Sequence, residues 1–499
     1  MNYKRIIKVL AVIVPMAIFS TSCDNGFAEL NTNPSTSDNL DGEFLLNFAL
    51  NRAASSRYET WRGNLIYTSQ WAQQLSGGWA PNNYQTTNED WLAAYWNEAF
   101  GTYMRNIQDI INQEEGTNLE AMAMIFKVMI MQRVTDMYGD IPYSEAFQGG
   151  TVPQPAYDTQ EEVYNAFISE LRQAIGQLSA GNGRTVGSFD PIYNGDIDKW
   201  RMFGNSLLLR VGMRLSEVNS TLAEETVAAA LSGGVFSSND DMAWIEFDGS
   251  MPDGPVASGI GEVFNDFGVG GGGFNLSDEF LDRLQAANDP REKVIAVTYN
   301  SDGSVNTNVG VGQHMGRVNG RDVPDAFEFA MPNHAVMTAY NSPVLYLTYA
   351  EVEFNRAEAI TRGWANGDAQ EAYENGIRAA CQQLALYPGA ETITDQEITD
   401  LLANANVAWD AGNAMNLINT QKWISLLFDG FEAYANYRRT GYPELTVGET
   451  VGESNGTNIP GRMRYPVSEI LANSDNYDEA VNRLSGGDVI TENVWWDAN

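Results

Sequence analysis

Apolar residues recur at intervals of three and four along most of the chain, which places them on one face of an α-helix. One such stretch follows Asn88 and runs to Ile110, and another begins after Asn118 and ends at Gly139, where glycine supplies the positive φ that terminates a helix. A stretch over residues 44–75 is interrupted by polar residues, which predicts one kinked helix or two short ones. Further helices are predicted over residues 160–178, 200–217, 277–287, 344–363, 369–386, 395–405 and 415–437. The pattern therefore predicts a mostly α fold.

One predicted helix pair fits part of the tetratricopeptide repeat. Small residues at Ala357, Ala369 and Gly376 and an aromatic residue at Tyr373 occupy the expected positions, with a turn at Gly363–Gly367 between the two helices. The proline of that repeat is absent. We expect a helical scaffold of tetratricopeptide-like hairpins.

The composition changes between residues 180 and 340, where Gly, Asn, Asp and Pro are frequent. Short β-prone pieces occur at residues 243–247 and 294–297. These features predict long irregular loop insertions with a few short strands on the helical scaffold, and such loops are where ligand contacts concentrate.

The N-terminus has the pattern of a bacterial lipoprotein signal. Basic residues, among them Lys4 and Lys8, accompany an apolar stretch, Ile6–Phe19, that is too short for a membrane span of about 20 residues. Small residues then precede Cys23, as a lipoprotein signal peptidase requires; a signal anchor or an ordinary secretory peptide is the alternative. The expected organisation is a signal peptide (1–22), a leader lipidated on Cys23 (23–43) and one domain (44–499), divided into N-terminal helices (44–217), a loop-rich insertion (218–343) and C-terminal helices with a closing segment (344–499).

The charge of the chain limits its partners. The net charge is −36, and removal of residues 1–22, which contain three basic and no acidic residues, makes it −39. Such a charge opposes binding to nucleic acid and leaves neutral ligands, or partners with basic patches, as the expected company. With Cys23 lipidated, Cys381 has no partner for a disulfide, and two histidines cannot build a zinc site of several His and Cys ligands. We expect no metal.

Several local motifs have ordinary structural explanations. The run Gly268–Gly273, with Asp289 downstream, formally contains GxGxxG, but no buried strand precedes it, so we predict a loop and no cofactor. The acidic group around Gly195 predicts a turn and N-cap, because its spacing does not match a calcium-binding loop. The pairs Glu353/Arg356 and Glu358/Arg362, at helical spacing, predict exposed ion pairs.

Two loop regions have the chemistry of a glycan site. Residues 74–85 place aromatic rings among amides in a Gly/Pro-rich loop; rings stack on the apolar faces of sugars, and amides hydrogen bond to the hydroxyls. The alternative is that these rings pack back on the scaffold. The candidate ligand-binding residues are, first, Trp79, Asn82, Asn83 and Tyr84 and, second, three phenylalanines around the glycine run, Phe264, Phe267 and Phe274.

Several sequence blocks, in order along nearly the whole chain, resemble those of the SusD/RagB family of Bacteroidetes surface lipoproteins, in the branch related to starch-binding outer-membrane proteins. The blocks are Phe27–Pro34, Thr135–Ala146, Asp190–Asp196 with Lys199–Arg214, Tyr349–Ala359, Gln421–Arg439 and Arg464–Pro466 with Glu469 and Asn473. Asp24 and Glu29 are similar to the export signal that sends such lipoproteins to the cell surface.

The resemblance implies a SusD-like fold and a non-catalytic protein, lipid-anchored in the outer membrane and surface-exposed. Members of the family sit over a SusC-like TonB-dependent barrel and capture oligosaccharides or peptides for import. The expected function is therefore glycan capture and delivery to such a transporter. Alternatives are a peptide-binding member of the family, a surface glycoside hydrolase using a carboxylate pair, and a lid with negligible affinity for soluble ligand.

Overall fold

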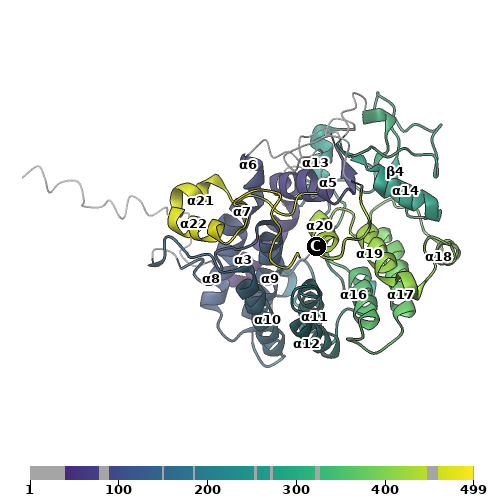
Figure 1. The fold of residues 1–499 in the computed structure, drawn as a ribbon. Coiled ribbons are helices and arrows are strands. Elements are labelled where there is room, and N and C mark those ends of the chain that lie inside the picture. The colour runs from purple at the N-terminus through teal and green to yellow at the C-terminus, as the bar shows by residue number, and fades with distance from the viewer. Residues whose placement is uncertain are drawn as a thin grey trace, which may run out of the picture. The chain divides into compact units, whose positions relative to one another are not determined.

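The computed structural model describes residues 40–77, 89–148, 151–183, 186–251, 256–269, 274–320, 326–446 and 459–497. Met1–Asp41 and Gly42–Asn499 form separate units, and the second contains all the helices and strands described below (Figure 1). Within the described residues, no helix combines the length and the apolarity needed to cross a membrane.

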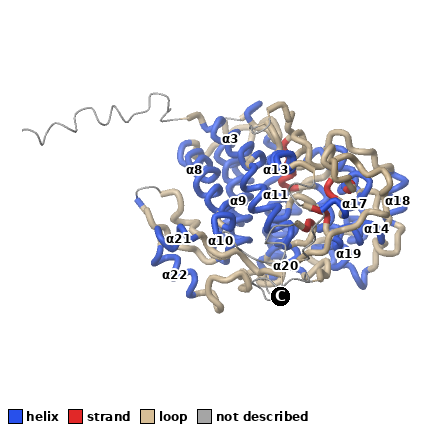
Figure 2. Tube along the Cα trace, turned by 90° about the horizontal axis from the view of Figure 1, so that it is seen from above, coloured by secondary structure: helices blue, strands red, loops and turns tan. Residues whose placement is uncertain are grey.

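Helices dominate this unit, and strands are confined to short segments (Figure 2). The first part contains α3 (Gly42–Ser55), α4 (Arg57–Glu59), the π-helix η2 (Thr60–Thr68), α5 (Ser69–Trp71), β1 (Leu75–Ser76), α6 (Glu89–Leu92), α7 (Ala94–Glu98), the π-helix η4 (Ala99–Tyr103), α8 (Met104–Gln113), α9 (Asn118–Tyr138) and α10 (Gln160–Gln177).

The middle of the chain alternates helices with short strands. It contains η6 (Gly187–Phe189), α11 (Ile197–Arg214), α12 (Ser220–Gly233), η7 (Asn239–Asp241), β2 (Ala243–Ile245), α13 (Gly259–Phe267), β3 (Asn275–Leu276), α14 (Asp278–Ala287), α15 (Glu292–Ile295), β4 (Ala296–Val297), η8 (Ala326–Glu328), β5 (Met331–Pro332) and β6 (Val344–Leu347). The strands form three antiparallel pairs, β1 with β3, β2 with β6 and β4 with β5.

The last part is again helical. It contains α16 (Tyr349–Thr361), α17 (Ala369–Gln382), η9 (Gln383–Leu386), α18 (Asp395–Leu402), η10 (Ala411–Asn413), α19 (Ala414–Ser425), α20 (Gly430–Thr440), α21 (Val467–Ala472) and α22 (Ser474–Asn482). The mostly α fold predicted from the sequence is thus confirmed.

Helix α9 lies at the centre of the N-terminal part. Thr117 caps its first turn by accepting a hydrogen bond from the Glu120 amide, and Gly139 ends it at φ +86°. Nearly every residue between these ends is buried, because α3, α8, α10, α11 and α20 all pack against it. A helix that is apolar on most sides in this way belongs to a core and not to a surface.

Helices α16 and α17 form the predicted tetratricopeptide-like hairpin and pack closely along their length. Gly376 permits the approach, since a Cβ at this position would lie 2.7 Å from the ring of Phe354. The turn between the helices contains Gly363 and Gly367 at positive φ, as the sequence predicts. The small positions of the repeat pattern therefore mark real helix contacts.

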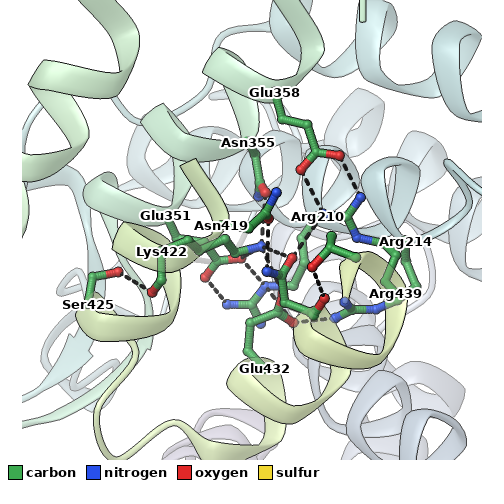
Figure 3. A network of polar contacts seen from close by, with 12 residues as sticks. Arg210, Arg214, Glu351, Asn355, Glu358, Asn419, Lys422, Ser425, Glu432 and Arg439 are labelled. Carbon is green, nitrogen blue, oxygen red and sulfur yellow. Dashed lines mark hydrogen bonds and ion pairs between the residues drawn. The ribbon is translucent and has the colours of Figure 1, made fainter. Parts of the chain in front are cut away.

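A network of buried charges joins α11, α16, α19 and α20 (Figure 3). Arg210 forms two hydrogen bonds to Glu351, of 2.7 and 2.5 Å, and Lys422 donates to Glu432 at 3.0 Å. Burial would raise the pKa of Glu432, but the positive charges of Arg214, Lys422 and Arg210 hold it well below its usual range. Glu432 is therefore ionised and paired inside the scaffold.

The prediction that the ion pairs on α16 are exposed is wrong for their carboxylates, which are buried. Arg356 does bind Glu353, and Arg362 does bind Glu358, but both carboxylates are only 1% exposed. Glu358 also binds Arg439 from the far side, which a helical spacing within α16 cannot reveal. Both carboxylates belong to the interface between helices, whereas Arg356 and Arg362 remain 37% and 20% exposed.

Some predicted element boundaries are also wrong. Residues 344–347 form β6, so the predicted helix begins only at Tyr349. The helix predicted over 415–437 is two helices, α19 and α20. Between them Phe428 adopts φ +73°, which a right-handed helix cannot continue through, and the chain turns before Gly430. The β-prone piece at 243–247 does contain β2, whereas the piece at 294–297 is divided between α15 and β4.

Candidate functional site

The predicted ligand-binding residues fall into two groups. Trp79, Asn82, Asn83 and Tyr84 lie outside the described residues, as does the predicted lipidation site, Cys23. The three phenylalanines are placed by the structure and differ in their exposure.

Phe264 and Phe274 belong to the core. They are 4% and 2% exposed, and their ring centres lie 5.6 Å apart. Phe264 also packs against the rings of His334 and Phe428. Neither phenylalanine offers a ring face to a ligand in this structure, which corresponds to the alternative that loop aromatics pack back on the scaffold.

Phe267, at the C-terminal end of α13, is partly exposed and belongs to a different group of rings. Its ring centre lies 5.3 Å from that of Trp61, and Trp61 lies 5.1 Å from Trp91. All three side chains are partly exposed. We call Trp61, Trp91 and Phe267 the Trp61 cluster. It presents adjoining aromatic surface at the protein exterior, which is the feature that the apolar face of a sugar ring requires.

The three rings come from separate elements that close packing brings together. Trp61 lies in η2, Trp91 in α6 and Phe267 in α13. Gly259, in the first turn of α13, makes this possible: a Cβ there would lie 2.6 Å from the Thr60 hydroxyl and 3.0 Å from the Ser56 carbonyl oxygen. A larger residue would push α13, and Phe267 with it, away from η2. Glycine at position 259 therefore has a direct role in assembling the cluster.

Polar groups accompany the rings. Arg57 forms an ion pair with Asp266, the residue before Phe267, and both side chains are partly exposed. The guanidinium of Arg62 lies 5.6 Å from the ring centre of Trp61. Guanidinium and carboxylate groups supply donors and acceptors for sugar hydroxyls. The Trp61 cluster thus combines stacking surface with hydrogen-bonding groups.

Glu59 precedes Trp61 by two residues in the chain. It lines a cavity of about 50 Å³ together with Tyr95 and Tyr103, and its Oε2 has no hydrogen-bond partner among the described residues. Burial, and then the negative charge of Glu98, raise the pKa of Glu59 to about 7. A raised carboxyl pKa is a property of catalytic acids. This cavity, however, is far below the ~300 Å³ at the lower end of ligand sites, so a sugar ring cannot enter it.

The two histidines do not form a catalytic group. His314 Nδ1 lies 3.0 Å from the Thr298 hydroxyl, and His334 packs between the rings of Phe264 and Tyr299. Burial lowers the pKa of both, that of His334 to about 4. In the part of the chain that the structure describes, neither side chain hydrogen bonds to a serine or to a carboxylate. Both imidazoles are neutral at pH 7.

The other motifs have the structural roles that the sequence predicts, as far as they are described. Asp190 accepts hydrogen bonds from the Ile192 and Gly195 amides and from the Trp200 indole, and Asp196 caps α11. Residues 270–273 of the glycine run lie outside the described residues. Asp289, the acidic residue downstream of that run, is buried and pairs with Arg291. No group of three His, Cys, Asp or Glu side chains within the described ranges is placed to hold a metal ion.

Sequence reasoning did not identify Trp61 and Trp91 as site residues. Trp61 follows a polar interruption in a helical pattern, and Trp91 comes directly after the loop that contains Trp79 and Tyr84. The signal for Trp91 was its position at the edge of that loop. For Trp61 there was none, since its neighbours Trp91 and Phe267 are distant in sequence.

Comparison with known proteins identifies related chains. The sequence profile of a SusD-like family, described as starch-binding and associating with the outer membrane, matches residues 34–466. No curated protein matches the chain significantly.

Solved structures resemble this one over nearly its whole length. A chitin-binding protein is 33% identical over 92% of this chain and 100% of its own, with a TM-score of 0.83. A SusD-like protein from Bacteroidetes AC2a is 29% identical, covers 92% and 100%, and has a TM-score of 0.81. A chitin-binding SusD homologue from Flavobacterium johnsoniae is 26% identical, covers 91% and 99%, and has a TM-score of 0.77. The SusD-like fold expected from the sequence is confirmed.

Proposed function

The chain belongs to the SusD-like family of starch-binding proteins that associate with the outer membrane, and we propose that it is a non-catalytic surface lipoprotein that captures oligosaccharides. It delivers them to a SusC-like TonB-dependent transporter. The proposal for this chain rests on its family, on the glycan-binding relatives and on one structural feature, the Trp61 cluster.

The Trp61 cluster supports glycan capture because of its ring arrangement. The ring centres of Trp91 and Phe267 lie 5.1 and 5.3 Å from that of Trp61, and each of the three side chains keeps part of its surface exposed. Exposed adjoining rings cost hydrophobic free energy unless a ligand covers them. A neutral sugar fits better than an anion, because the chain carries a net charge of −36.

Chitin oligosaccharide is the glycan that we propose for this site. Two relatives that cover more than nine tenths of this chain are described as chitin-binding. N-acetylglucosamine units are uncharged and have apolar ring faces, so they suit the Trp61 cluster and the acidic surface. The loop residues Trp79, Asn82, Asn83 and Tyr84, which precede Trp91 in sequence, remain proposed contacts to the same ligand.

A glycoside hydrolase is the alternative that one observation favours, the raised pKa of Glu59. Its carboxyl lies in a cavity of about 50 Å³ and not at the exposed face of the rings. A hydrolase needs both carboxylates beside the scissile bond. The capture function therefore has the stronger support.

Co-sedimentation with insoluble chitin, starch and cellulose tests the proposed function. We expect the purified mature chain to be retained by chitin and to release no new reducing ends. New reducing ends would show an enzyme. Retention by none of the polysaccharides, together with binding to peptides, would show that the peptide-binding alternative is correct.

The anchor and the partner need their own tests. Membrane fractionation of the Cys23→Ala protein should give soluble material if lipid on Cys23 anchors the chain. Purification of the wild-type protein from mild detergent should bring a TonB-dependent barrel with it. An unchanged membrane fraction for the variant would contradict the lipid anchor, and a chain purified without a barrel would contradict the transporter partnership.

A further inference from the structure

A second cleft lies between α14, α19 and the segment that follows α20. Its volume is about 450 Å³, within the range of about 300–1,000 Å³ typical of small-molecule sites. Its walls carry mainly amide, hydroxyl and charged groups. Helices α14, α18 and α19 lie on the right in Figure 1, whereas α6, which carries Trp91, lies to the left of centre, so the cleft is separate from the Trp61 cluster.

Gln421 is the buried polar group of this cleft. Its side chain is only 4% exposed, and its Oε1 accepts a 2.6 Å hydrogen bond from Arg291 Nη2. Since a guanidinium can only donate, this contact fixes which end of the amide is oxygen. The Nε2 group therefore points away from Arg291 and has no partner among the described residues. Because Gln421 lines the cleft, its two N–H donors are available to a ligand there.

The position of Gln421 is held rigidly. Arg291 is bound through Nε and Nη2 by both oxygens of Asp289, at distances of 2.5 to 3.1 Å. Both residues are 1% exposed. A buried donor that is oriented by a charged pair behind it is the arrangement expected of a binding group, because its orientation is fixed before the ligand arrives.

One face of α19 and the residue before it supply further groups. Asn413, Asn416 and Thr420 follow at intervals of three and four residues, and all of them line the cleft. Thr420 donates to Asn416 Oδ1 at 3.0 Å, which leaves the Asn416 Nδ2 donors free of any described partner. The side-chain amide of Asn413 also has no partner among the described residues, whereas its backbone N–H donates to the Asp410 carbonyl oxygen. This wall thus offers both hydrogen-bond donors and acceptors.

The charged groups of the cleft do not select an anion. Asp410 and Glu444 contribute acceptors, and Arg283 is already bound by Glu279 and by the Glu444 carbonyl oxygen. No aromatic ring lines the cleft among the described residues. A neutral ligand with many hydroxyl or amide groups fits this set of donors and acceptors.

We propose that the cleft is a second carbohydrate site, which binds a mono- or disaccharide unit of a neutral glycan through Gln421, Asn416 and Asn413. Binding is weak, since the site has hydrogen-bonding groups without a stacking surface. A long glycan held at one site is present at high effective concentration at the other. Even a weak second site on the same molecule therefore lengthens the time for which such a glycan stays bound.

Saturation-transfer NMR with the full mature chain tests the site separately from the proposed function. The protein carries Trp61→Ala and Trp91→Ala, so that the Trp61 cluster contributes nothing, and the probes are N,N′-diacetylchitobiose, cellobiose and maltose at millimolar concentration. We expect at least one disaccharide to receive saturation. Gln421→Glu, which keeps an oxygen for Arg291, and Asn416→Asp, which keeps one for Thr420, should each reduce the signal at least fivefold.

Gln173→Glu is the matched control, because Gln173 is an exposed amide on α10 with no described partner; it should leave the signal unchanged. Thermal unfolding verifies that each variant is folded. The proposal is overturned if none of the three disaccharides receives saturation in the double tryptophan variant. It is also overturned if the folded Gln421→Glu and Asn416→Asp proteins give the full signal.

Discussion

Arg439 of α20 binds both carboxylate oxygens of Glu358 of α16, at 2.6 and 2.7 Å. Both side chains are 1% exposed, so the pair is removed from water. It ties the tetratricopeptide-like hairpin to α20, the helix that follows the turn at Phe428. Such a pair is costly to bury but more costly to break, because the remaining partner is left charged and unpaired.

Replacement of Arg439 by alanine should therefore destabilise the protein strongly. We expect the free energy of unfolding to fall by about 3–5 kcal/mol, as for other buried pairs that lose one partner. Arg172→Ala is the control, because Arg172 and Glu225 form a pair with 42% and 66% exposed side chains, and exposed pairs contribute about 0–1 kcal/mol. Urea unfolding measures both, and equal losses would show that burial of the Arg439 pair has no special effect.

The same pair predicts sensitivity to acid. Burial would raise the pKa of Glu358, but the charge and hydrogen bonds of Arg439, with the charge of Arg362, lower it to about 2. A carboxyl whose pKa is lowered in the folded state contributes stability above its ordinary pKa of 4.5 and loses it as the pH falls toward 2. Glu358→Gln should flatten the fall in unfolding free energy between pH 4.5 and 2. A curve as steep as that of the wild type would contradict this assignment.

The close contact of α16 and α17 gives a test of the hairpin. In Gly376→Ala the new Cβ would lie 2.7 Å from the Phe354 ring, and overpacking of this kind costs about 1–3 kcal/mol. Gly176→Ala in α10 is the matched substitution, since nothing lies within 4 Å of its added Cβ. There the better helix propensity should stabilise by up to about 1 kcal/mol. Thermal unfolding should therefore show shifts of opposite sign, and a stabilised Gly376→Ala protein would contradict the packing.

Glu59 predicts the opposite pH dependence to Glu358. Its pKa rises from 4.5 to about 7 on folding, so the folded state holds more protons than the unfolded state between these values. Stability should fall as the pH rises from about 4.5 to 7. Arg52, Arg62 and Glu98 are the charged groups whose fields act on Glu59. Tyr95 and Tyr103, which line the same cavity, are neutral between pH 4.5 and 7, because burial raises the pKa of both.

Glu59→Gln should remove this dependence and raise the free energy of unfolding at pH 8 by about 1–3 kcal/mol, since one pKa unit corresponds to about 1.4 kcal/mol. Glu224→Gln, an exposed position on α12, should change neither quantity. Denaturant unfolding at pH 5 and at pH 8 measures both variants. A Glu59→Gln protein less stable than the wild type at pH 8 would show that the carboxylate has a stabilising partner there.

The scaffold was largely predictable because amphipathic helices leave a local signal. Helix α9 is an example: it was predicted to begin after Asn118 and to end at Gly139, and it begins at Asn118 and ends at Gly139 in the structure. Helix α12 was missed, since the residues that it buries are small or polar (Ala223, Thr226, Val227 and Ala230) and give a weak pattern. The turn at Phe428, which separates α19 from α20, was missed because a non-glycine residue takes positive φ there, although the Asp429–Gly430 pair is a turn signal.

The site was much less predictable than the scaffold. Sequence composition directed attention to loops with aromatic residues, whereas the rings of the Trp61 cluster lie on helices, and burial divides Phe264 from Phe267, three positions apart on one helix. The Trp61 cluster depends on tertiary packing that Gly259 permits. Likewise, the orientation of Gln421 depends on Arg291, which is distant in sequence. No periodicity in the chain encodes such contacts.

Calorimetric titration of chitin hexasaccharide into the wild type and into the Trp61→Ala/Trp91→Ala protein tests the central claim most directly. Loss of two stacking surfaces should weaken binding at least tenfold, or by about 1.4 kcal/mol or more. Trp364→Ala is the control, because Trp364 is also partly exposed but lies on the turn between α16 and α17; it should bind like the wild type. Equal affinity of all three proteins, with folds intact, would contradict glycan capture by the Trp61 cluster.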